Sequence, residues 1–338
     1  MAALDLSLLQ TVRDAVSPAS GLRRIANDTL RLPLAPGGFR YITDLPFPLT
    51  FEQPVGISSP PGETNRLFVL EKPGRIIVIP NLSAPTRRVF LDISDRVFQE
   101  QECGLLGIAF HPQFARNRYF YITYTSGAFW EVQLRLARFE VSPDDPNTAL
   151  PNSETPLYSL SDGDPWHEGG DLHFGPDGYL YVSVGDGGFT SQKAQRIDQD
   201  LFSGILRLDV DKRPGNLAPN PHPSVTDNYA IPSDNPFVGA TSFNGVPVDP
   251  EHVRTEYFVI GLRNPWRFSF DALTGYLYSN DTGSEYREEI NMIFKGVNYG
   301  WPFTEGSLTH TNVLGGAVKP AILFPPLAEY GYEGGGAS

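Results

Sequence analysis

One histidine opens a glycine-rich segment in the middle of the chain. His167 is followed at once by Glu168, Gly169 and Gly170, then by a short apolar run and a Pro-Asp-Gly turn. Imidazole has the ordinary side-chain pKa closest to neutrality, so a histidine beside a pocket can take a proton from a substrate as a general base. The two glycines would let a ligand or a neighbouring backbone come close. The alternative is a surface histidine ahead of a hairpin.

Three more polar residues stand in positions equivalent to that of His167, just ahead of a short apolar segment. Glu102 precedes one such segment, and Arg263 with Asn264 precedes another. A base, a cation and hydrogen-bonding groups around a cavity are the usual ingredients of an active or binding site. We therefore predict that these four residues form one site, provided that the fold gathers them.

The acidic segment 281–289 is the best candidate for binding a cation. It offers several carboxylates and the carbonyl oxygens of a loop, which are the ligands that calcium prefers. The spacing is not that of an EF-hand, and a solvated acidic loop is the alternative. A zinc site is not expected, because His167 and His173 do not match the His-Glu-x-x-His pattern. Asp186, in a Gly-Asp-Gly-Gly segment, is interpreted as an acceptor within a turn.

The chain repeats one pattern of β-strands, which supplies the framework for these residues. Each copy begins with a short apolar strand, turns at Pro, Asp or Gly, and continues with a strand rich in aromatic and β-branched residues. The matching strands begin near residues 67, 119, 180 and 276, and a Pro- and Asn-rich insertion at about 213–250 separates the last two. Strand groups that recur every ~40–60 residues are typical of propeller blades. The sequence therefore predicts an all-β propeller with about four blades.

A propeller would bring the candidate residues together. The first strand of each blade lines the central channel, so the residues just before it meet at the channel mouth. Because exposed sheet edges must be protected, a propeller closes on itself. The segment 325–338 resembles the approach to a further blade, so we expect a propeller over 44–338 that is incomplete at the C-terminus. An amphipathic helix over 4–16 and a linker are predicted within 1–43.

Composition excludes several classes of function. The 338 residues carry a net charge of −13 and contain no block rich in Lys or Arg. Nucleic acid is therefore not an expected partner, since phosphate binding needs a basic surface. No apolar stretch approaches the ~20 residues of a membrane-spanning helix, so no membrane span is expected. The N-terminus also lacks a signal-peptide pattern.

Five ordered motifs from about residue 44 onward resemble the soluble PQQ-dependent sugar dehydrogenases, the glucose/sorbosone and aldose sugar dehydrogenase family. They are Gly104-Leu-Leu-Gly-Ile-Ala-Phe-His-Pro112, His167-Glu-Gly-Gly170, Gly175-Pro-Asp-Gly178 with Leu180-Tyr-Val, Gly261-Leu-Arg-Asn-Pro265, and Glu289-Ile-Asn291 with Lys295-Gly-Val-Asn-Tyr-Gly-Trp-Pro302. The resemblance implies a six-bladed propeller with PQQ over the channel mouth, and oxidation of an aldose at C1 by hydride transfer to PQQ. It also implies an external electron acceptor and a periplasmic or secreted location.

The resemblance assigns roles to the residues at the channel mouth. His167 matches the general base that takes the proton from the anomeric hydroxyl. Arg263 matches the arginine near the reacting quinone oxygen, and Asn264 matches its hydrogen-bonding neighbour. Three positions depart from the pattern of the glucose dehydrogenases. Glu102 stands where they have a glutamine, Trp166 replaces an aspartate beside the base, and Gly187 replaces a glutamine after the Gly-Asp pair. A carboxylate at Glu102 near the three carboxylates of PQQ would be costly unless it were protonated or metal-bound.

The resemblance also implies two calcium ions. The carbonyls of Gly283 and Ser284 match the pair that ligates the calcium bound to PQQ, and this ion polarises the quinone as a Lewis acid. Glu289 and Tyr299 match positions of a second, structural calcium. The lysine and the other arginines that clamp the cofactor in the family lie in two further blades, beyond the last residue of this sequence.

Two other functions stay open at this point. The same fold resembles the propeller of hedgehog-interacting proteins, which would make the chain a non-catalytic binding module. A calcium-dependent hydrolase of the lactonase kind is the other alternative. Calcium binding without PQQ uptake would favour the binding module, and lactone opening without an electron acceptor would favour the hydrolase.

Overall fold

The computed structural model describes residues 49–188, 193–310 and 319–331. Nearly all of the regular structure in these residues is β-strand, and the α-helix α3 (Phe114–Asn117) is one turn long. The prediction of an all-β fold is therefore confirmed. The predicted N-terminal unit, 1–43 with its helix, lies outside the described residues.

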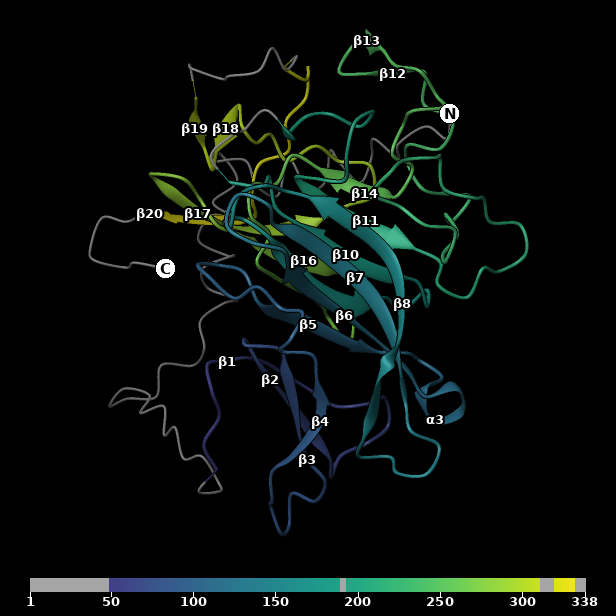
Figure 1. The fold of residues 1–338 in the computed structure, drawn as a ribbon. Coiled ribbons are helices and arrows are strands. Elements are labelled where there is room, and N and C mark those ends of the chain that lie inside the picture. The colour runs from purple at the N-terminus through teal and green to yellow at the C-terminus, as the bar shows by residue number, and fades with distance from the viewer. Residues whose placement is uncertain (1–48, 189–192, 311–318, 332–338) are drawn as a thin grey trace.

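Four antiparallel sheets of four strands form the blades of a propeller (Figure 1). Blade 1 contains β1 (Pro54–Ser58), β2 (Leu67–Glu71), β3 (Arg75–Ile79) and β4 (Arg88–Asp92), and blade 2 contains β5 (Leu105–Phe110), β6 (Tyr119–Ser126), β7 (Gln133–Val141) and β8 (Ala149–Ser161). Blade 3 contains β9 (Gly169–Phe174), β10 (Leu180–Val184), β11 (Gly204–Leu208) and β14 (Tyr257–Ile260), and blade 4 contains β15 (Arg267–Phe270), β16 (Leu277–Asp281), β17 (Arg287–Ile293) and β20 (Ala328–Gly331). Two short hairpins interrupt blades 3 and 4, namely β12 (Ser242–Phe243) with β13 (Val246–Pro247) and β18 (Thr304–Glu305) with β19 (Leu308–Thr309). The four strands predicted to match one another are β2, β6, β10 and β16, the second strand of each blade.

The first strands of the blades follow one another around the propeller axis. β5 packs against β1 on one side and β9 on the other, and β9 also packs against β15. The innermost strands thus stand in chain order, as the sequence pattern predicted. The residues just ahead of β5, β9 and β15 consequently lie at one end of the channel.

Arg267 of β15 ties three blades together at the centre. Its Nη2 donates hydrogen bonds to the carbonyl of Val55 in β1 (2.9 Å) and to the carbonyl of Leu106 in β5 (3.3 Å). Burial lowers the pKa of this guanidinium, although the charge of Asp171 opposes the shift. A single side chain from blade 4 therefore holds the innermost strands of blades 1 and 2.

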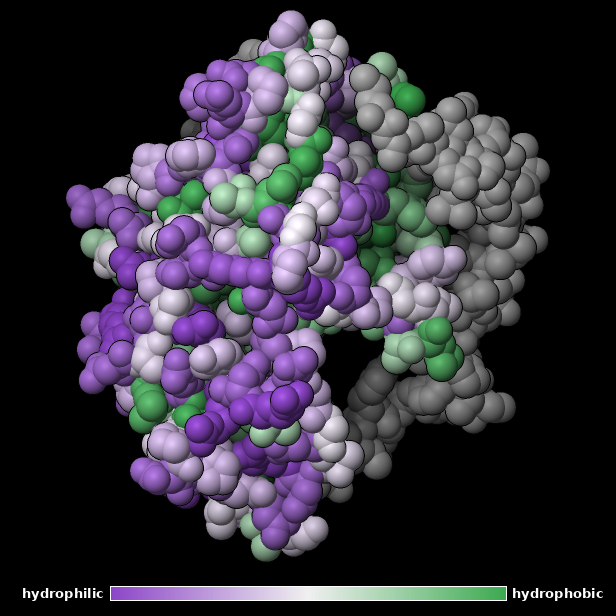
Figure 2. Space-filling view, turned by 90° about the vertical axis from the view of Figure 1, so that its right-hand side faces the viewer, coloured by the Kyte–Doolittle hydropathy of each residue, from purple (hydrophilic) through white to green (hydrophobic). Residues whose placement is uncertain are grey.

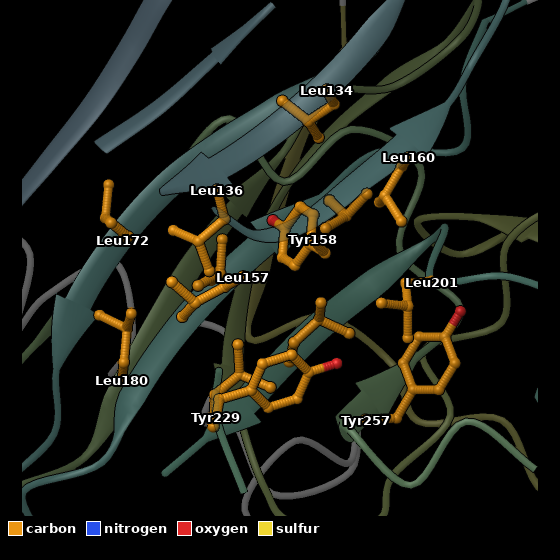
Figure 3. Packing of buried hydrophobic residues seen from close by; sticks show 14 of the residues in the cluster. Leu134, Leu136, Leu157, Tyr158, Leu160, Leu172, Leu180, Leu201, Tyr229 and Tyr257 are labelled. Atoms are coloured by element: carbon orange, nitrogen blue, oxygen red, sulfur yellow. The ribbon is translucent and has the colours of Figure 1, made fainter. Parts of the chain in front are cut away.

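Leucine side chains fill the space between blades 2 and 3. Leu134 and Leu136 of β7 pack in the same buried cluster as Leu172 of β9 and Leu180 of β10 (Figure 3). Burying each of these side chains stabilises the fold by roughly 1.5–3 kcal/mol. All six residues of β5 are buried as well, because neighbouring blades cover both of its faces. This explains why β5 appears in the sequence as a continuous apolar run without alternation.

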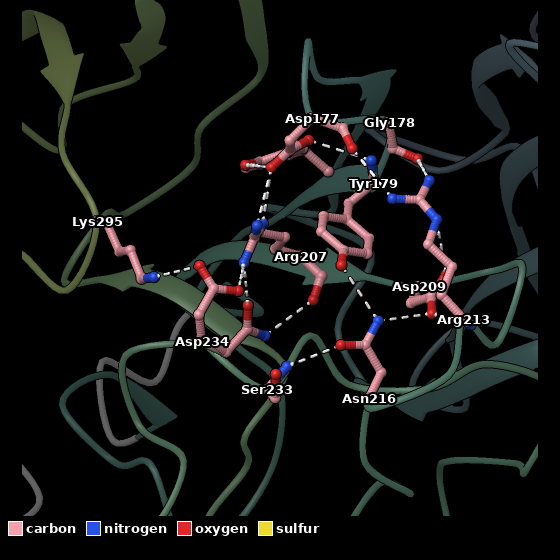
Figure 4. Close-up of polar contacts among 12 residues, drawn as sticks. Asp177, Gly178, Tyr179, Arg207, Asp209, Arg213, Asn216, Ser233, Asp234 and Lys295 are labelled. Atoms are coloured by element: carbon pink, nitrogen blue, oxygen red, sulfur yellow. Dashed lines mark hydrogen bonds and ion pairs between the residues drawn. The ribbon is translucent and has the colours of Figure 1, made fainter.

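The insertion between β11 and β14 is fastened to blade 3 by charged side chains (Figure 4). Arg207 of β11 donates to Asp177 in the β9–β10 turn (3.0 Å) and to Asp234 in the insertion (2.7 Å). Lys295, which follows β17, pairs with the second oxygen of Asp234 (2.7 Å). This network connects blade 3, the insertion and blade 4 away from the channel mouth.

The surface is mainly hydrophilic, with hydrophobic residues in small groups on the face that Figure 2 shows. In the part of the chain that the structure describes, no helix has the length and apolar character needed to cross a membrane. Phe129 and Trp130, in the β6–β7 turn, are among the exposed aromatic residues.

Gly107 lies in β5 where this strand approaches β9. A β-carbon at this position would lie 2.4 Å from the carbonyl oxygen of Gly170 and 2.5 Å from the side chain of Leu172. We expect Gly107→Ala to lower the free energy of unfolding by about 1–3 kcal/mol, because the two strands must move apart. Urea denaturation measures this loss. Gly56→Ala in β1 is the control, since its nearest neighbour would be 3.8 Å away, and equal losses in both variants would contradict the explanation.

Candidate functional site

The structure brings three of the predicted residues into contact, each from a different blade. Glu102, ahead of β5, accepts hydrogen bonds through Oε2 from the backbone N–H of His167 (2.8 Å) and from Nδ2 of Asn264 (3.1 Å). The Oδ1 atom of Asn264 accepts a hydrogen bond from the N–H of Gly169 (3.1 Å). These contacts form one polar cluster where the segments that precede β5, β9 and β15 meet.

The imidazole of His167 is held by Asp186, which the sequence alone placed only as a turn acceptor. Nδ1 of the imidazole lies 2.7 Å from Oδ1 of Asp186, whose side chain is 1% exposed. The second oxygen, Oδ2, accepts a hydrogen bond from the indole N–H of Trp301 (2.8 Å). A carboxylate beside Nδ1 favours the tautomer that carries its proton there, which leaves Nε2 as a proton acceptor. Asp186 also serves the turn, because Oδ1 accepts from the N–H of Gly188 (3.1 Å).

The pairing of β9 with β10 explains how Asp186 reaches His167. Val184 at the end of β10 is opposite Gly169 at the start of β9, so the residues beyond these two ends meet. A β-carbon at Gly185 would lie 1.8 Å from the carbonyl oxygen of His167, and only glycine permits this approach. His167 itself has a φ of 60°, a conformation that costs a non-glycine residue about 1–3 kcal/mol and that clusters at functional sites.

Arg263 links this cluster to the candidate cation-binding loop. Its Nη1 donates to the carbonyl of Gly283 (2.8 Å), one of the two carbonyls expected to ligate calcium. The guanidinium lies 5.4 Å from the ring centroid of Trp301, and the backbone carbonyl of Arg263 accepts from the N–H of Asp186 (2.8 Å). Arg263 therefore contacts Asp186, the partner of His167, and also Trp301, which donates to the same carboxylate.

Asp281, at the end of β16, fixes the backbone of both Arg263 and Asn264. Its Oδ1 accepts from the N–H of Asn264 (2.7 Å) and its Oδ2 from the N–H of Arg263 (2.8 Å). Burial, followed by the charge of Glu289, raises the pKa of Asp281 well above its ordinary value, although the two N–H donors oppose this. This role could not be predicted from local sequence, because it depends on the end of β16 lying beside the residues that precede β15.

The loop that carries Gly283 and Ser284 is folded around the carboxylate of Glu305. Oε1 of Glu305 accepts hydrogen bonds from the N–H groups of four consecutive residues, 284–287, at 2.7–2.9 Å. Burial opposes the charge, but these donors outweigh it and lower the pKa of Glu305. The other oxygen lies 3.0 Å from Nε2 of His310. The loop backbone is thereby held in one conformation.

The other two residues expected to bind calcium make hydrogen bonds within blade 4. Glu289 of β17 is buried, accepts a hydrogen bond from Asn291 (2.9 Å), and has a pKa raised by burial. The phenol of Tyr299 donates to the carbonyl of Met292 (2.7 Å) and accepts from the N–H of Phe294 (2.9 Å). Among the described residues, no three or more His, Cys, Asp or Glu side chains are grouped to hold a metal ion. A calcium site at this loop therefore depends on backbone carbonyls.

Two buried acids lie near the polar cluster. Glu168 accepts a hydrogen bond from Sγ of Cys103 (3.3 Å), and Asp162 pairs with Lys193. Burial raises the pKa of Glu168 well above its ordinary value. Burial also raises the pKa of Asp162 to about 7, with Lys193 opposing the shift and neighbouring acids such as Asp186 adding to it.

We expect the stability of the fold to decrease as the pH rises from about 4 to about 7. The pKa of Asp162 is about 7 in the folded chain and ~3.9 in the unfolded chain, so its contribution is complete below pH ~4 and is lost as the pH passes 7. Asp162→Asn should flatten this part of the curve, measured by urea unfolding at several pH values. The exposed Asp144→Asn is the control and should keep the slope. An Asp162→Asn variant with the original slope would show that another group is responsible.

The protein resembles characterised sequences over most of its length. The family model described as Glucose / Sorbosone dehydrogenase matches residues 51–321. Hedgehog-interacting protein of Homo sapiens is 31% identical over 73% of this chain and 35% of its own length. Quinoprotein glucose dehydrogenase B of Acinetobacter calcoaceticus is 30% identical over 72% of this chain and 49% of its own length. The chain thus spans less than half the length of either relative.

The fold also matches a solved structure, the PQQ-bound form of an aldose sugar dehydrogenase from Streptomyces coelicolor. The TM-score is 0.58 and the identity 23%, with 83% of this chain and 69% of that chain covered. At this identity the likeness shows the shared propeller fold. The family model, in contrast, matches residues 51–321, which include the first three blades and the first three strands of blade 4. The chain therefore belongs to the glucose/sorbosone dehydrogenase family.

Proposed function

We propose that this protein is a PQQ- and calcium-dependent dehydrogenase that oxidises an aldose at C1 to the lactone. The observation that carries the proposal is the pair of His167 and buried Asp186, which lies beside Arg263 where three blades meet. Family membership and the names of the relatives support it, since a quinoprotein glucose dehydrogenase is among them. An external electron acceptor and a periplasmic or secreted location belong to the same proposal.

The charged groups at the channel mouth suit an anionic quinone. Arg263 supplies a cation, and the buried amide of Asn264 holds Glu102 and the N–H of Gly169 in place. Glu102, one departure from the family pattern, directs Oε2 to the N–H of His167 and to Asn264, so its charge is met by two donors. These two hydrogen bonds offset part of the repulsion between the Glu102 carboxyl group and a bound anion.

We assign both calcium ions of this proposal to blade 4 and its loops. The carbonyls of Gly283 and Ser284 would hold the ion that contacts PQQ, on a loop that Glu305 fixes through four N–H groups. Glu289 and Tyr299 would hold the second ion. Oxygen ligands of this kind are what calcium prefers.

His167 performs the proton transfer in this mechanism. Its Nε2 takes the proton of the C1 hydroxyl while the C1–H bond breaks, and Asp186 stabilises the imidazolium that forms. PQQ, when bound, supplies the acceptor for the hydride from C1, and calcium polarises its quinone carbonyl. Arg263 places a positive charge beside the atoms where negative charge develops. The sugar loses one proton and one hydride in total and becomes a lactone.

Reconstitution tests the proposal directly. Adding PQQ and calcium chloride to the purified protein should change the absorption spectrum of PQQ and start the reduction of a dye acceptor by aldoses. Removing calcium with EDTA should reverse both effects. PQQ binding without dye reduction by any aldose in a broad panel would contradict the proposed activity.

A non-catalytic binding module is the second candidate function. The similarity to Hedgehog-interacting protein, at 31% identity, favours it. Calcium binding with no uptake of PQQ in the same reconstitution experiment would support this candidate. Lactone hydrolysis without an electron acceptor would contradict both candidates and favour a hydrolase.

A further inference from the structure

Three aromatic side chains form a cluster beside the candidate base, and we term Phe129, Trp130 and Trp166 the aromatic platform. The ring centroids are 5.4 Å apart for Phe129 and Trp130, 6.0 Å for Phe129 and Trp166, and 6.3 Å for the two tryptophans. Trp130 is 62% exposed and Phe129 is 39% exposed. The platform therefore presents aromatic surface to solvent.

The segment that carries Trp166 is attached to the polar cluster at the channel mouth. Trp166 directly precedes His167 in the chain. The carbonyl of Pro165 accepts a hydrogen bond from the N–H of Glu102 (3.2 Å), the residue that also binds the N–H of His167. A ligand whose reacting atom lies at His167 would thus extend onto the platform with its next chemical unit.

The backbone of Trp130 is in an unfavourable conformation that the loop imposes. Its φ is 68°, in the left-handed region that bulky residues rarely adopt. The N–H of Glu131 donates to the carbonyl of Ala128 (2.9 Å), and the N–H of Asp162 donates to the carbonyl of Val132 (2.9 Å), which ties the loop to the segment before His167. A strained residue whose side chain stays exposed gains little from the fold itself, and strain of this kind clusters at ligand sites.

Single exposed aromatic residues are common on proteins and need no explanation, but a contiguous group beside a polar site indicates a binding surface. Asp164 lies next to the platform and packs against Gly188, at 3.1 Å from the β-carbon that residue would carry. The side chain of Asp164 is half-buried. Aromatic faces that pack on the C–H face of a sugar ring are one element of a carbohydrate subsite, and polar groups beside them are the other.

We propose that the aromatic platform binds the second sugar ring of a reducing oligosaccharide whose terminal ring is oxidised at His167. The inference rests on the proposed function and narrows its substrate class from aldoses in general to oligosaccharides with a free reducing end. The platform would raise affinity for the longer sugars without touching the reacting carbon. Preference among aldoses is then set by the aromatic platform, while the reaction at C1 is left to His167 and Asp186.

Trp130→Gly is the variant that tests this proposal, because glycine removes the ring and accepts the left-handed backbone. The KM for maltotriose, divided by the KM for glucose, should rise roughly tenfold, which corresponds to the ~1.4 kcal/mol typical of an aromatic contact. Urea denaturation should show that the variant folds at least as stably as the original. Tyr276→Ala, which removes an exposed aromatic ring from the β15–β16 turn, is the matched control and should leave the ratio unchanged.

A second measurement separates this inference from the proposed function. Maltotriitol has no reducing end and cannot be oxidised at C1, so its binding can be titrated by tryptophan fluorescence without any turnover. Binding by the original protein that is lost in Trp130→Gly supports the platform, even if no sugar reduces the dye and the proposed function fails. An unchanged KM ratio in an active enzyme, or no maltotriitol binding by the original protein, would overturn it.

Discussion

Replacing His167 with glutamine is expected to lower the rate of aldose oxidation by roughly 10²–10⁴-fold. Glutamine has a similar length and can still contact Asp186, but its amide cannot take the proton of the C1 hydroxyl. The rate of dye reduction at saturating sugar measures the loss. Uptake of PQQ, followed by its absorption, should persist, which separates a failure of chemistry from a failure of binding.

His173→Gln provides the control for this variant. His173 lies six positions further along the chain and also has a carboxylate partner, since its Nε2 is 3.2 Å from Oδ2 of Asp171. It belongs to β9 and is separate from the polar cluster at the mouth, so its replacement should leave turnover close to the original. Equal losses in the two variants, or full activity in His167→Gln, would remove His167 from its assigned role.

Asp186→Asn is expected to lower kcat by roughly 10³–10⁴-fold. The asparagine amide can donate to Nδ1 of His167, which would place the imidazole proton on Nε2, where the substrate proton has to go. The loss of charge would also leave the imidazolium without its partner. The measurement is kcat as a function of pH, because a change of tautomer lowers the rate across the whole profile.

Trp301→Phe is the matched control for Asp186→Asn. It removes the indole N–H that binds Oδ2 of Asp186 (2.8 Å) but keeps the carboxylate charge and its contact with His167. We expect it to weaken the site only modestly, by less than about tenfold, the scale of one hydrogen bond. If Asp186→Asn retained its kcat while Trp301→Phe lost it, the indole would be the group that matters.

The repeating strands could be predicted because each blade obeys the same local rule. β5 is buried along its whole length and appears as an apolar run. β9 and β15 are followed by turn residues that mark their ends, so all three strands were recognisable from local sequence. The convergence of Glu102, His167 and Asn264 followed from that rule, since each precedes an inner strand.

The roles of Asp186, Asp281 and Glu305 could not be predicted in the same way. Each of these carboxylates is positioned by pairing between strands or by a hairpin distant in sequence, and a local pattern contains no information on such registers. Asp186 meets His167 only because Val184 is opposite Gly169. A rule that examines residues just beyond the end of the second strand of each blade would have found Asp186.

The hydrogen bond from Arg267 to Val55 has a consequence for the order in which the protein is made. The two residues are 212 positions apart, so blades 1 to 3 leave the ribosome before the guanidinium exists. During that interval the emerging chain must rely on the leucine layers between neighbouring blades, because domains assemble from the N-terminus during translation. Ribosome-bound chains that end before β15 therefore lack this hydrogen bond, and the innermost strand of blade 1 is held by Arg267 only after blade 4 has appeared.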